Sequence, residues 1–325
     1  MEESLRDLQL AMAAHRKPGA EPRELRGEAA DARPLAMRRL ARDIERISGI
    51  EITGVIEAKL ARVLSSVDVG ELESWISRLH LLPGGDPEWL SLIEALTVHE
   101  TFFHRDRSQL ELLAQILAET VRGAAQNGRR QLRLWSAGCA TGEEAYTLAI
   151  LALDALRDAG FADRAADGGI VCRAPWQVDV LGSDISRLVL TQAKAAVYST
   201  EGLSAFRGLP QELQRFFPVL PKSGETGEAE LRGVLPSIRQ VVRFRHRNLV
   251  SGLPPETGFD VVLCRNVLIY LTADARRAAQ SLFKEALRPG GYLLLGPTDA
   301  LADPAGYEVR WGKGAVAYAL RPRNG

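Results

Sequence analysis

Two carboxylates follow a glycine-bearing turn near the middle of the chain, at a position where many nucleotide-binding proteins hold a phosphate. The turn runs from an apolar segment, Leu132–Trp135, through Gly138 and Gly142 to Glu143 and Glu144, which open a segment with helical spacing. It lacks the G-x-G-x-x-G spacing of pyrophosphate sites, and carboxylates replace the bare amides and lysine that a phosphate requires. A cofactor here is therefore expected to carry positive charge. S-adenosylmethionine, with an ammonium, a sulfonium and no phosphate, fits better than NAD or ATP.

The turn and the apolar run that follows it supply three candidate cofactor contacts. Gly138 permits the tight turn and a close approach of the cofactor to the backbone. Glu144 is expected to pair with the cofactor ammonium, while Glu143 favours the positive end of the helix dipole. Asp184 ends the run that starts at Val178, so we expect it at the carboxyl edge of the second strand, accepting hydrogen bonds from both ribose hydroxyls. The alternative for Asp184 is a helix N-cap.

A polar segment upstream of the turn carries further candidates. Thr101 and Arg105 are four residues apart, so a helical turn would place both on one face, where they could meet the methionine carboxylate of the cofactor. The alternative is a helix N-cap and a surface arginine. His99 and His104 are each a candidate for a cofactor contact or a satisfied interface histidine, and the interface interpretation is preferred for His104.

Composition excludes the more specialised classes of protein. The chain has 325 residues, 46% hydrophobic and 25% charged, which is ordinary for a globular protein large enough for two domains. Lysine plus arginine and aspartate plus glutamate are equal at 41 each, so net charge gives no argument for a nucleic-acid partner. No charged-then-apolar leader opens the sequence, and no apolar run approaches the roughly 18 residues of a membrane span. We expect a cytoplasmic protein without direct membrane insertion.

The sequence contains no residue pattern typical of a metal site or of a catalytic nucleophile. The five histidines include no H-x-x-x-H pair, and no Ser-His-Asp set has a coherent placement. No metal is therefore expected. Three cysteines without a C-x-x-C pair are interpreted as reduced thiols in or beside buried strands: Cys139, Cys172 and Cys264.

Changes in composition and in the spacing of apolar residues divide the chain into three expected parts. Residues 1–34 are polar and rich in Pro and Gly, which predicts at most a short leading helix and little fixed structure around 16–34. Residues 35–123 repeat apolar side chains at three- and four-residue spacings, which predicts an all-α domain. Residues 124–325 alternate β-type runs with helical segments, which predicts an α/β domain with an open, mostly parallel, doubly wound sheet. The expected strands are Leu132–Trp135, Val178–Leu181, Val241–Phe244, Phe259–Cys264, Tyr292–Leu295 and a final hairpin of Tyr307–Trp311 with Ala315–Leu320.

One section interrupts this alternation. About 60 residues separate the helix that ends near Tyr198 from the strand at Phe259, far more than one crossover requires. The excess predicts an inserted subdomain of two or three short antiparallel strands at about 212–246.

Four sequence blocks, taken together, resemble the CheR-type chemotaxis receptor methyltransferases. In chain order they are Thr97–Asp106, Trp135–Tyr146, Gly182–Ile185 and Phe259–Tyr270. The resemblance covers roughly residues 40 to 320. It implies a Rossmann-like methyltransferase fold with an antiparallel last strand, and methyl transfer from S-adenosylmethionine to receptor glutamates, with S-adenosylhomocysteine as the product.

The resemblance also assigns roles to residues that spacing alone does not. It supports cofactor contacts for His99, Thr101 and Arg105, places Asn248 and Leu249 at the adenine edge, and places Asn266 and Val267 along the cofactor beside the reacting centre. Tyr270 is expected nearest the transferred methyl, and it and Arg105 are the candidate catalytic residues. The alternative for Tyr270 is an interior tyrosine. A glutamate carboxylate is already ionised at neutral pH, so the reaction requires no general base.

The partner is less constrained than the cofactor. Four arginines lie close to one helical face, which fits an acidic helical partner or, alternatively, a solvated basic face: Arg38, Arg39, Arg42 and Arg46. In the family, the inserted strands can hold an extended peptide by strand addition. A non-catalytic S-adenosylmethionine-binding adaptor, or a methyltransferase acting on another substrate, remains an alternative. The absence of an N/D-P-P-Y/F motif after the fourth strand argues against methylation of base amines.

Overall fold

The computed structural model describes residues 29–65, 67–202, 204–221 and 229–322. The expected mobile extension therefore lies mostly outside the described residues. The chain forms two compact units: one extends to Val98 and also takes in Tyr270–Arg276, and the other holds His99–Ile269 and the chain from Arg277 onward. This boundary differs from the expected one at residue 123, because helix α6 (Arg107–Gln126) packs on α7 (Glu143–Asp158) and on β11 (Ala315–Leu320) within the second unit.

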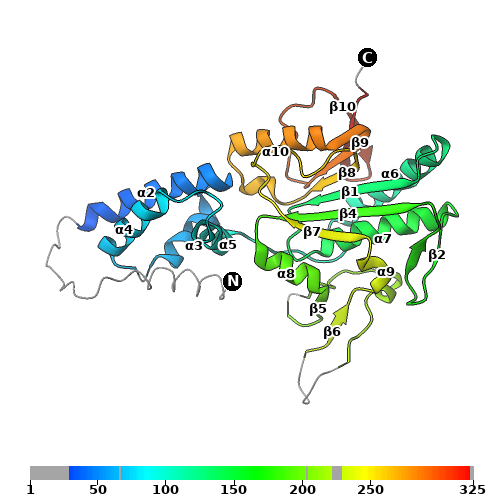
Figure 1. Ribbon diagram of the computed structural model, residues 1–325, viewed down its shortest axis with the longest axis horizontal. Helices are drawn as coiled ribbons and strands as arrows, with labels where there is room; N and C mark the ends of the chain where they lie inside the picture. Colours follow the sequence, from blue (N-terminus) through cyan, green and yellow to red (C-terminus); the bar gives the residue numbers. More distant parts are fainter. Residues whose placement is uncertain (1–28, 66, 203, 222–228, 323–325) are drawn as a thin grey trace. The chain divides into compact units, whose positions relative to one another are not determined.

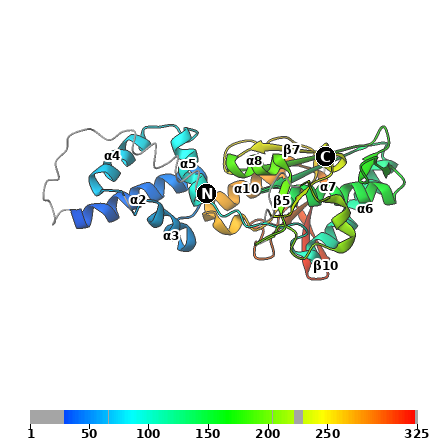
Figure 2. The ribbon, with the colours of Figure 1, turned by 90° about the horizontal axis from the view of Figure 1, so that it is seen from below.

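The described residues of the first unit form four helices, seen together in Figures 1 and 2. They are α2 (Ala29–Ser48), α3 (Gly54–Val63), α4 (Val69–His80) and α5 (Pro87–Leu96). Two of these helices have aspartate N-caps: the Asp68 and Asp86 carboxylates accept backbone amides of the first turn of α4 and α5. The first helix starts at Ala29, inside the segment predicted to have little fixed structure. The segment Tyr270–Arg276 joins this unit, since the Tyr270 carbonyl accepts the Glu51 amide at 2.8 Å.

The second unit contains a seven-stranded sheet. In chain order its strands are β1 (Gln131–Ala137), β4 (Gln177–Asp184), β7 (Val242–His246), β8 (Phe259–Cys264), β9 (Leu287–Leu295), β10 (Tyr307–Gly312) and β11. Their spatial order is β10-β11-β9-β8-β1-β4-β7 (Figure 1). The first five are mutually parallel, and β11 runs antiparallel to both of its neighbours. The doubly wound fold and its antiparallel end are therefore confirmed.

Alternating side chains let the sheet bury both faces. In β1, Leu132 and Leu134 join the apolar cluster formed with α6 and α7. Trp135 instead contacts Phe259 and, on α10 (Ala273–Ala286), Phe283, with ring centroids 5.7 and 5.6 Å apart. Helix α8 (Arg187–Ala195) packs on β4 and β7.

The inserted antiparallel strands are confirmed, but their bounds differ from those predicted. Strands β5 (Val197–Ser199) and β6 (Leu231–Gly233) form an antiparallel pair, and a 3₁₀ turn, η1 (Gln211–Phe216), lies between them in sequence. The run at 241–245 is not part of this subdomain, because β7 pairs in parallel with β4 as an edge strand of the main sheet. The short helix α9 (Pro236–Arg239) connects the two. The long segment before β4 forms another two-stranded pair, β2 (Ala162–Arg164) with β3 (Ile170–Cys172).

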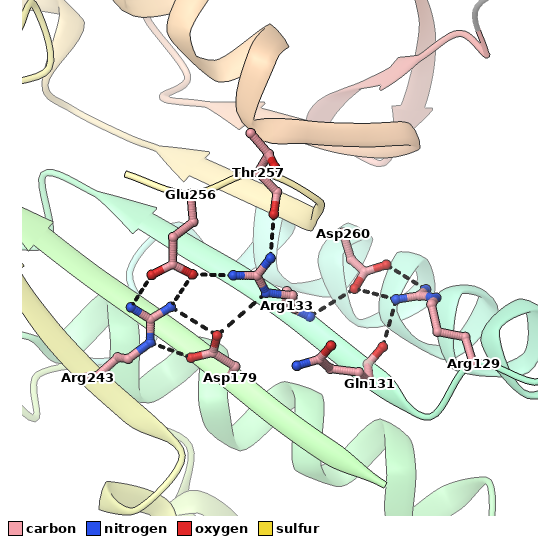
Figure 3. Close-up of polar contacts among 8 residues, drawn as sticks. All are labelled: Arg129, Gln131, Arg133, Asp179, Arg243, Glu256, Thr257 and Asp260. Atoms are coloured by element: carbon pink, nitrogen blue, oxygen red, sulfur yellow. Dashed lines mark hydrogen bonds and ion pairs between the residues drawn. The ribbon is translucent and has the colours of Figure 1, made fainter. Parts of the chain in front are cut away.

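A network of ion pairs fixes the amino ends of the parallel strands (Figure 3). Asp260, at the start of β8, is fully buried and accepts two hydrogen bonds from Arg129, at 2.6 and 2.9 Å, and one from the Arg133 amide at 2.9 Å. Arg288 donates to the same carboxylate at 2.5 Å. Beside it, Arg243 pairs with two carboxylates, those of Asp179 and Glu256. The Arg133 side chain contacts the Glu256 carboxylate and the Thr257 carbonyl.

We expect Asp260→Ala to lower the free energy of unfolding by about 3–5 kcal/mol, because two guanidinium groups would lose the buried carboxylate that compensates them. Chemical denaturation monitored by circular dichroism measures the change. Asp163→Ala is the control, since Asp163 pairs with Arg173 on an exposed surface and its removal should change stability little. An equal effect of the two substitutions would contradict the structural role of Asp260.

Candidate functional site

The site lies where the strand order reverses. The chain places β4 and β7 on one side of β1 and β8 and β9 on the other. In open α/β sheets, ligands bind beyond the carboxyl ends of the strands at such a reversal. The carboxyl ends of β1, β4, β7 and β8 lie along one edge of the sheet. These ends and the segments that follow them carry the predicted residues other than His99, Thr101 and Arg105.

The turn after β1 has little capacity to bind a phosphate through its backbone. The amides of Gly138 and Cys139 both donate to the Ser183 carbonyl, at 2.8 and 2.9 Å, and the Gly142 amide donates to the Cys139 carbonyl at 2.9 Å. The Ala140 amide donates to the Asp184 carboxylate at 2.9 Å. These four donors, which a phosphate loop would direct at its ligand, are bonded within the protein. The structure thus agrees with the prediction of a cofactor without phosphate.

Two glycines allow this turn to be compact. A Cβ on Gly138 would stand 2.4 Å from the Val267 side chain, so the turn and the segment after β8 approach closely. A Cβ on Gly142 would meet Ala193 at 2.9 Å, and both glycines have positive φ, 83° and 97°. Larger residues would push the turn away from β8 and α8. Gly138 and Val267, predicted separately as cofactor contacts, therefore lie together.

Asp184 holds the turn in place. One carboxylate oxygen accepts the Ala140 amide, and the other accepts the Ser186 amide at 3.0 Å. The Ser186 side chain, rather than Asp184, caps α8, because its hydroxyl accepts the Val189 amide. Each carboxylate oxygen can accept more than one hydrogen bond, so these bonds leave the proposed ribose contacts chemically feasible.

The two glutamates at the start of α7 are both withdrawn from solvent. Burial raises the pKa of Glu143 to about 7, against a hydrogen bond from the Thr141 hydroxyl at 2.7 Å that lowers it. Burial also raises the pKa of Glu144, and the nearby Arg265 guanidinium opposes that rise. Glu144 accepts the Ser136 hydroxyl at 2.7 Å and lies 3.3 Å from Arg265. Its carboxylate is thus held facing the carboxyl end of β1.

Arg265 is a residue of the site that sequence reasoning missed. It directly follows β8, and its side chain is only 3% exposed. Its guanidinium donates to the Arg105 carbonyl at 2.6 Å and the Asp106 carboxylate at 2.9 Å, besides pairing with Glu144. One feature of the sequence could have identified it: an arginine stands immediately before Asn266, in the fourth block, where the apolar pattern predicts a buried strand. A buried arginine requires partners, and here they come from two other segments.

The helical turn expected across Thr101 and Arg105 is wrong. Residues 97–102 have no helical structure, a turn follows, and α6 begins only at Arg107. Arg105 donates to the Glu100 carbonyl at 2.8 Å and lies over the Phe102 ring at 5.7 Å. The backbone lacks helical geometry because Phe103 anchors it elsewhere: its amide donates to the Ala205 carbonyl.

Aromatic packing fixes this segment against the insertion. The Phe103 ring is buried and contacts three other rings, with centroids 4.3 to 5.3 Å apart: Tyr198, Phe206 and Phe217. The Tyr198 hydroxyl donates to the Thr141 carbonyl at 2.8 Å, so the same cluster reaches the turn after β1. His99 is half-buried at the beginning of this segment. The His104 amide donates to the Thr147 hydroxyl at 3.3 Å, and burial lowers the pKa of the imidazole.

The remaining predicted contacts follow β7 and β8. The Asn248 side-chain oxygen accepts the Val250 amide at 3.1 Å, which forms a tight turn, and Leu249 is buried. The chain there is tied to β4, since the Arg247 amide donates to the Asp184 carbonyl at 2.8 Å. Asn266 has a positive φ of 58°. Tyr270 ends a 3₁₀ turn, η2 (Leu268–Tyr270), and groups with the helical unit.

Similarity to known proteins decides the family. The family model described as CheR methyltransferase, SAM binding domain, matches residues 99–310, well over half of the chain. The chain belongs to the CheR methyltransferase family. Chemotaxis protein methyltransferase 1 of Pseudomonas aeruginosa is 34% identical over 249 residues, which are 76% of this chain and 82% of that protein.

Two further relatives agree with the CheR assignment. Chemotaxis protein methyltransferase Cher2 of Pseudomonas putida is 32% identical over 250 residues, with 76% of this chain and 82% of that protein covered. A chemotaxis protein methyltransferase of Listeria innocua is 28% identical over 273 residues, with 82% and 90% covered. The predicted resemblance is therefore confirmed, and this CheR protein is an S-adenosylmethionine-dependent methyltransferase of chemotaxis.

The residues of this CheR site fit S-adenosylmethionine. Three buried or nearly buried carboxylates stand at the carboxyl ends of β1 and β4: Glu143, Glu144 and Asp184. Such a set favours a cofactor that carries an ammonium and a sulfonium over one that carries phosphates. The cofactor predicted from the turn is confirmed by the family.

Three further features of the described residues concern metals, thiols and membranes. No group of three or more His, Cys, Asp or Glu side chains there is placed to hold a metal ion. The three cysteines are free thiols, and Cys139 and Cys264 are buried. None of the helices in the described ranges is long and apolar enough to cross a membrane.

We expect Asp184→Ala to weaken S-adenosylhomocysteine binding at least about tenfold, because hydrogen bonds to a charged group contribute about 1.5–3 kcal/mol each. Calorimetric titration measures the dissociation constant. Asp184→Asn keeps one oxygen that can accept the Ala140 amide, so comparing the two variants separates support of the turn from ribose contacts. An unchanged dissociation constant for Asp184→Ala would exclude both roles.

Proposed function

We propose that this protein transfers the methyl group of S-adenosylmethionine to glutamate side chains of a chemoreceptor or related signalling protein, forming glutamyl methyl esters. The reaction would take place in the cytoplasm, on the cytoplasmic domain of that receptor. The observation that carries the proposal is the charge around Phe102: the Arg207 and Arg105 guanidinium groups lie 4.2 and 5.7 Å from its ring centre. Arg207 also pairs with the Glu100 carboxylate at 2.7 Å, whereas Arg105 donates to a backbone carbonyl and keeps its charge, so this surface suits an anionic methyl acceptor better than an amine.

Methyl transfer to a carboxylate makes modest demands on the protein. The bound cofactor supplies a methyl group on a positively charged sulfur, which leaves without protonation. A glutamate side chain, with an ordinary pKa near 4.3, is already ionised at neutral pH. The protein therefore has to align the carboxylate, remove water and hold both partners, rather than transfer a proton.

The residues divide these tasks. Glu144 would bind the cofactor ammonium and Asp184 the ribose hydroxyls, while Thr101, His99 and Arg105 would meet the methionine end. Asn248 and Leu249 would contact adenine, and Asn266 and Val267 would line the cofactor. Arg105 also donates to the Glu100 carbonyl, which orients its guanidinium. Tyr270 would orient the acceptor carboxylate without serving as a base.

Two surfaces suit a receptor. On α2, Arg38, Arg39, Arg42 and Arg46 are all exposed, whereas Leu40 and Ile44 on the opposite face are buried. Only Arg46 of these four has a carboxylate partner among the described ion pairs, Asp43 at 3.0 Å. The β5–β6 pair has apolar side chains that are partly exposed, including Val197 and Leu231, and offers a place for an extended peptide.

The product decides between the proposal and its alternatives. Incubation with labelled S-adenosylmethionine and receptor-containing membranes should label a protein whose label is released as methanol in base, because esters hydrolyse there and methylated amines do not. Tyr270→Phe should lower the rate of labelling while leaving S-adenosylhomocysteine affinity nearly unchanged, since its role concerns the acceptor.

Label that resists alkali would contradict ester formation and point to another substrate class. Cofactor binding without any labelling of receptor would favour a non-catalytic adaptor. If Tyr270→Phe lost binding and fold together, Tyr270 would be a core residue rather than a catalytic one.

Reversing two charges on α2, Arg39→Glu with Arg42→Glu, should slow methylation of intact receptor and reduce its dependence on salt, because an attractive surface would become repulsive. Cofactor affinity should not change, since the proposed ligands lie in the other unit. The measurement is methylation rate against ionic strength.

A matched control reverses Arg122 and Arg157, which are exposed on α6 and α7 and give the same change in net charge. Equal curves for the two double variants would leave α2 as an ordinary solvated face and move the docking surface to the β5–β6 pair.

A further inference from the structure

The Arg265 side chain joins two segments that are both proposed to bind the methionine end of the cofactor. Its guanidinium contacts the segment that carries Arg105, through the Arg105 carbonyl and the Asp106 carboxylate, and it also pairs with Glu144 at 3.3 Å. The side chain is 3% exposed, so water competes little for these bonds. Its Nε has no hydrogen-bond partner among the described residues, which shows that the guanidinium is positioned by its terminal nitrogens alone.

The surroundings of Glu144 leave Arg265 as its closest cation. Ser136 on β1 donates a hydrogen bond, the Arg105 guanidinium lies at longer range and the Asp106 carboxylate opposes ionisation. The thiols of Cys139 and Cys264 interact electrostatically with the Glu144 carboxylate. Burial raises the pKa of both thiols, so they stay neutral. Glu143 is adjacent in the chain. Removing the guanidinium would leave Glu144 and Asp106 repelling each other in a buried site.

The backbone on either side of Arg265 depends on the same bonds. Asp106 has a φ of 58° and Asn266 has the same value, a conformation that non-glycine residues adopt only when other contacts enforce it. The Arg265 guanidinium bonds Asp106 directly, and its own backbone precedes Asn266. Loss of these bonds would relax both segments.

We infer that Arg265 is a positioning residue that keeps Glu144 ionised to receive the cofactor ammonium and holds the Arg105 segment beside it. The inference rests on the proposed function, because that function assigns the cofactor ammonium to Glu144 and the methionine end of the cofactor to the segment of Arg105. It predicts a pH signature that a purely structural arginine would not have. Without the neighbouring positive charge, the pKa of the buried Glu144 rises further, so its carboxylate is lost at a higher pH as the solution is acidified.

The test is calorimetric titration of S-adenosylhomocysteine into wild type, Arg265→Gln and Arg265→Lys between about pH 5.5 and 8. This ligand carries the same ammonium and needs no turnover. We expect wild type and Arg265→Gln to differ by only a few-fold in affinity at pH 8 and by at least about tenfold at pH 6. Arg265→Lys keeps the charge, so its pH dependence should follow wild type, whereas its methylation rate should fall because one ammonium cannot reach all three partners.

Glu143, with a pKa of about 7, titrates in the same range, so each comparison is repeated in a Glu144→Gln background. There the extra loss at low pH caused by Arg265→Gln should disappear. Persistence of that loss would overturn the inference, as would parallel pH profiles for Arg265→Gln and wild type.

If Arg265→Gln does not fold, as judged by thermal unfolding without ligand, Arg265→Lys decides alone. A lysine variant whose affinity declines at a higher pH than wild type would show that charge at this position does not govern Glu144. Wild-type protein that binds no S-adenosylhomocysteine at any pH would overturn the cofactor assignment itself. That outcome is distinct from binding with an unaltered pH profile, in which only the role of Arg265 fails.

Discussion

The Asp184 carboxylate accepts backbone amides from both of its sides, Ala140 in the turn after β1 and Ser186 at the start of α8, and the geometry of the site depends on this pair of bonds. Ala140 has a positive φ of 45°, an unfavourable conformation for alanine, and the hydrogen bond from its amide to Asp184 helps to hold it there. By satisfying these amides internally, the protein removes the feature that makes similar turns phosphate sites. The same carboxylate remains at the strand edge as a negative charge, which suits a cationic cofactor.

Backbone strain is concentrated around this edge. Of the five described non-glycine residues with positive φ, four lie in the segments that form the site: His104, Asp106, Ala140 and Asn266. Each such conformation has a cost that surrounding contacts must offset. The Asp184 carboxylate holds Ala140, the Arg265 guanidinium holds Asp106 and the Thr147 hydroxyl accepts the His104 amide. The site is thus a set of loops held in unfavourable conformations by a few charged groups, which is why single substitutions there are expected to act on binding and rate.

Stability is provided at the opposite end of the same strands. Asp260, Arg129 and Arg288 join the beginnings of β8, β1 and β9, and Arg243 joins β7 to Glu256 in the loop before β8. That loop begins directly after Asn248 and Leu249, so the network also fixes one end of the segment proposed to contact adenine. Sheet register and loop position are therefore coupled through ion pairs that take no part in the chemistry.

The sequence by itself determined what depends on local pattern. Alternating apolar runs identified the strands, the spacing of glycines and carboxylates identified a turn for a cationic cofactor, and four ordered blocks identified the family. It could not determine which distant groups meet. The helical turn expected at Thr101 does not form, because Phe103 packs into an aromatic cluster with residues more than 90 positions away. The strand at Val242–His246 belongs to the main sheet rather than to the insertion, because β4 was available to pair with it. Arg265 read as part of a buried strand, and only the tertiary structure, which brings Asp106 and Glu144 to its guanidinium, shows why a charge is buried there.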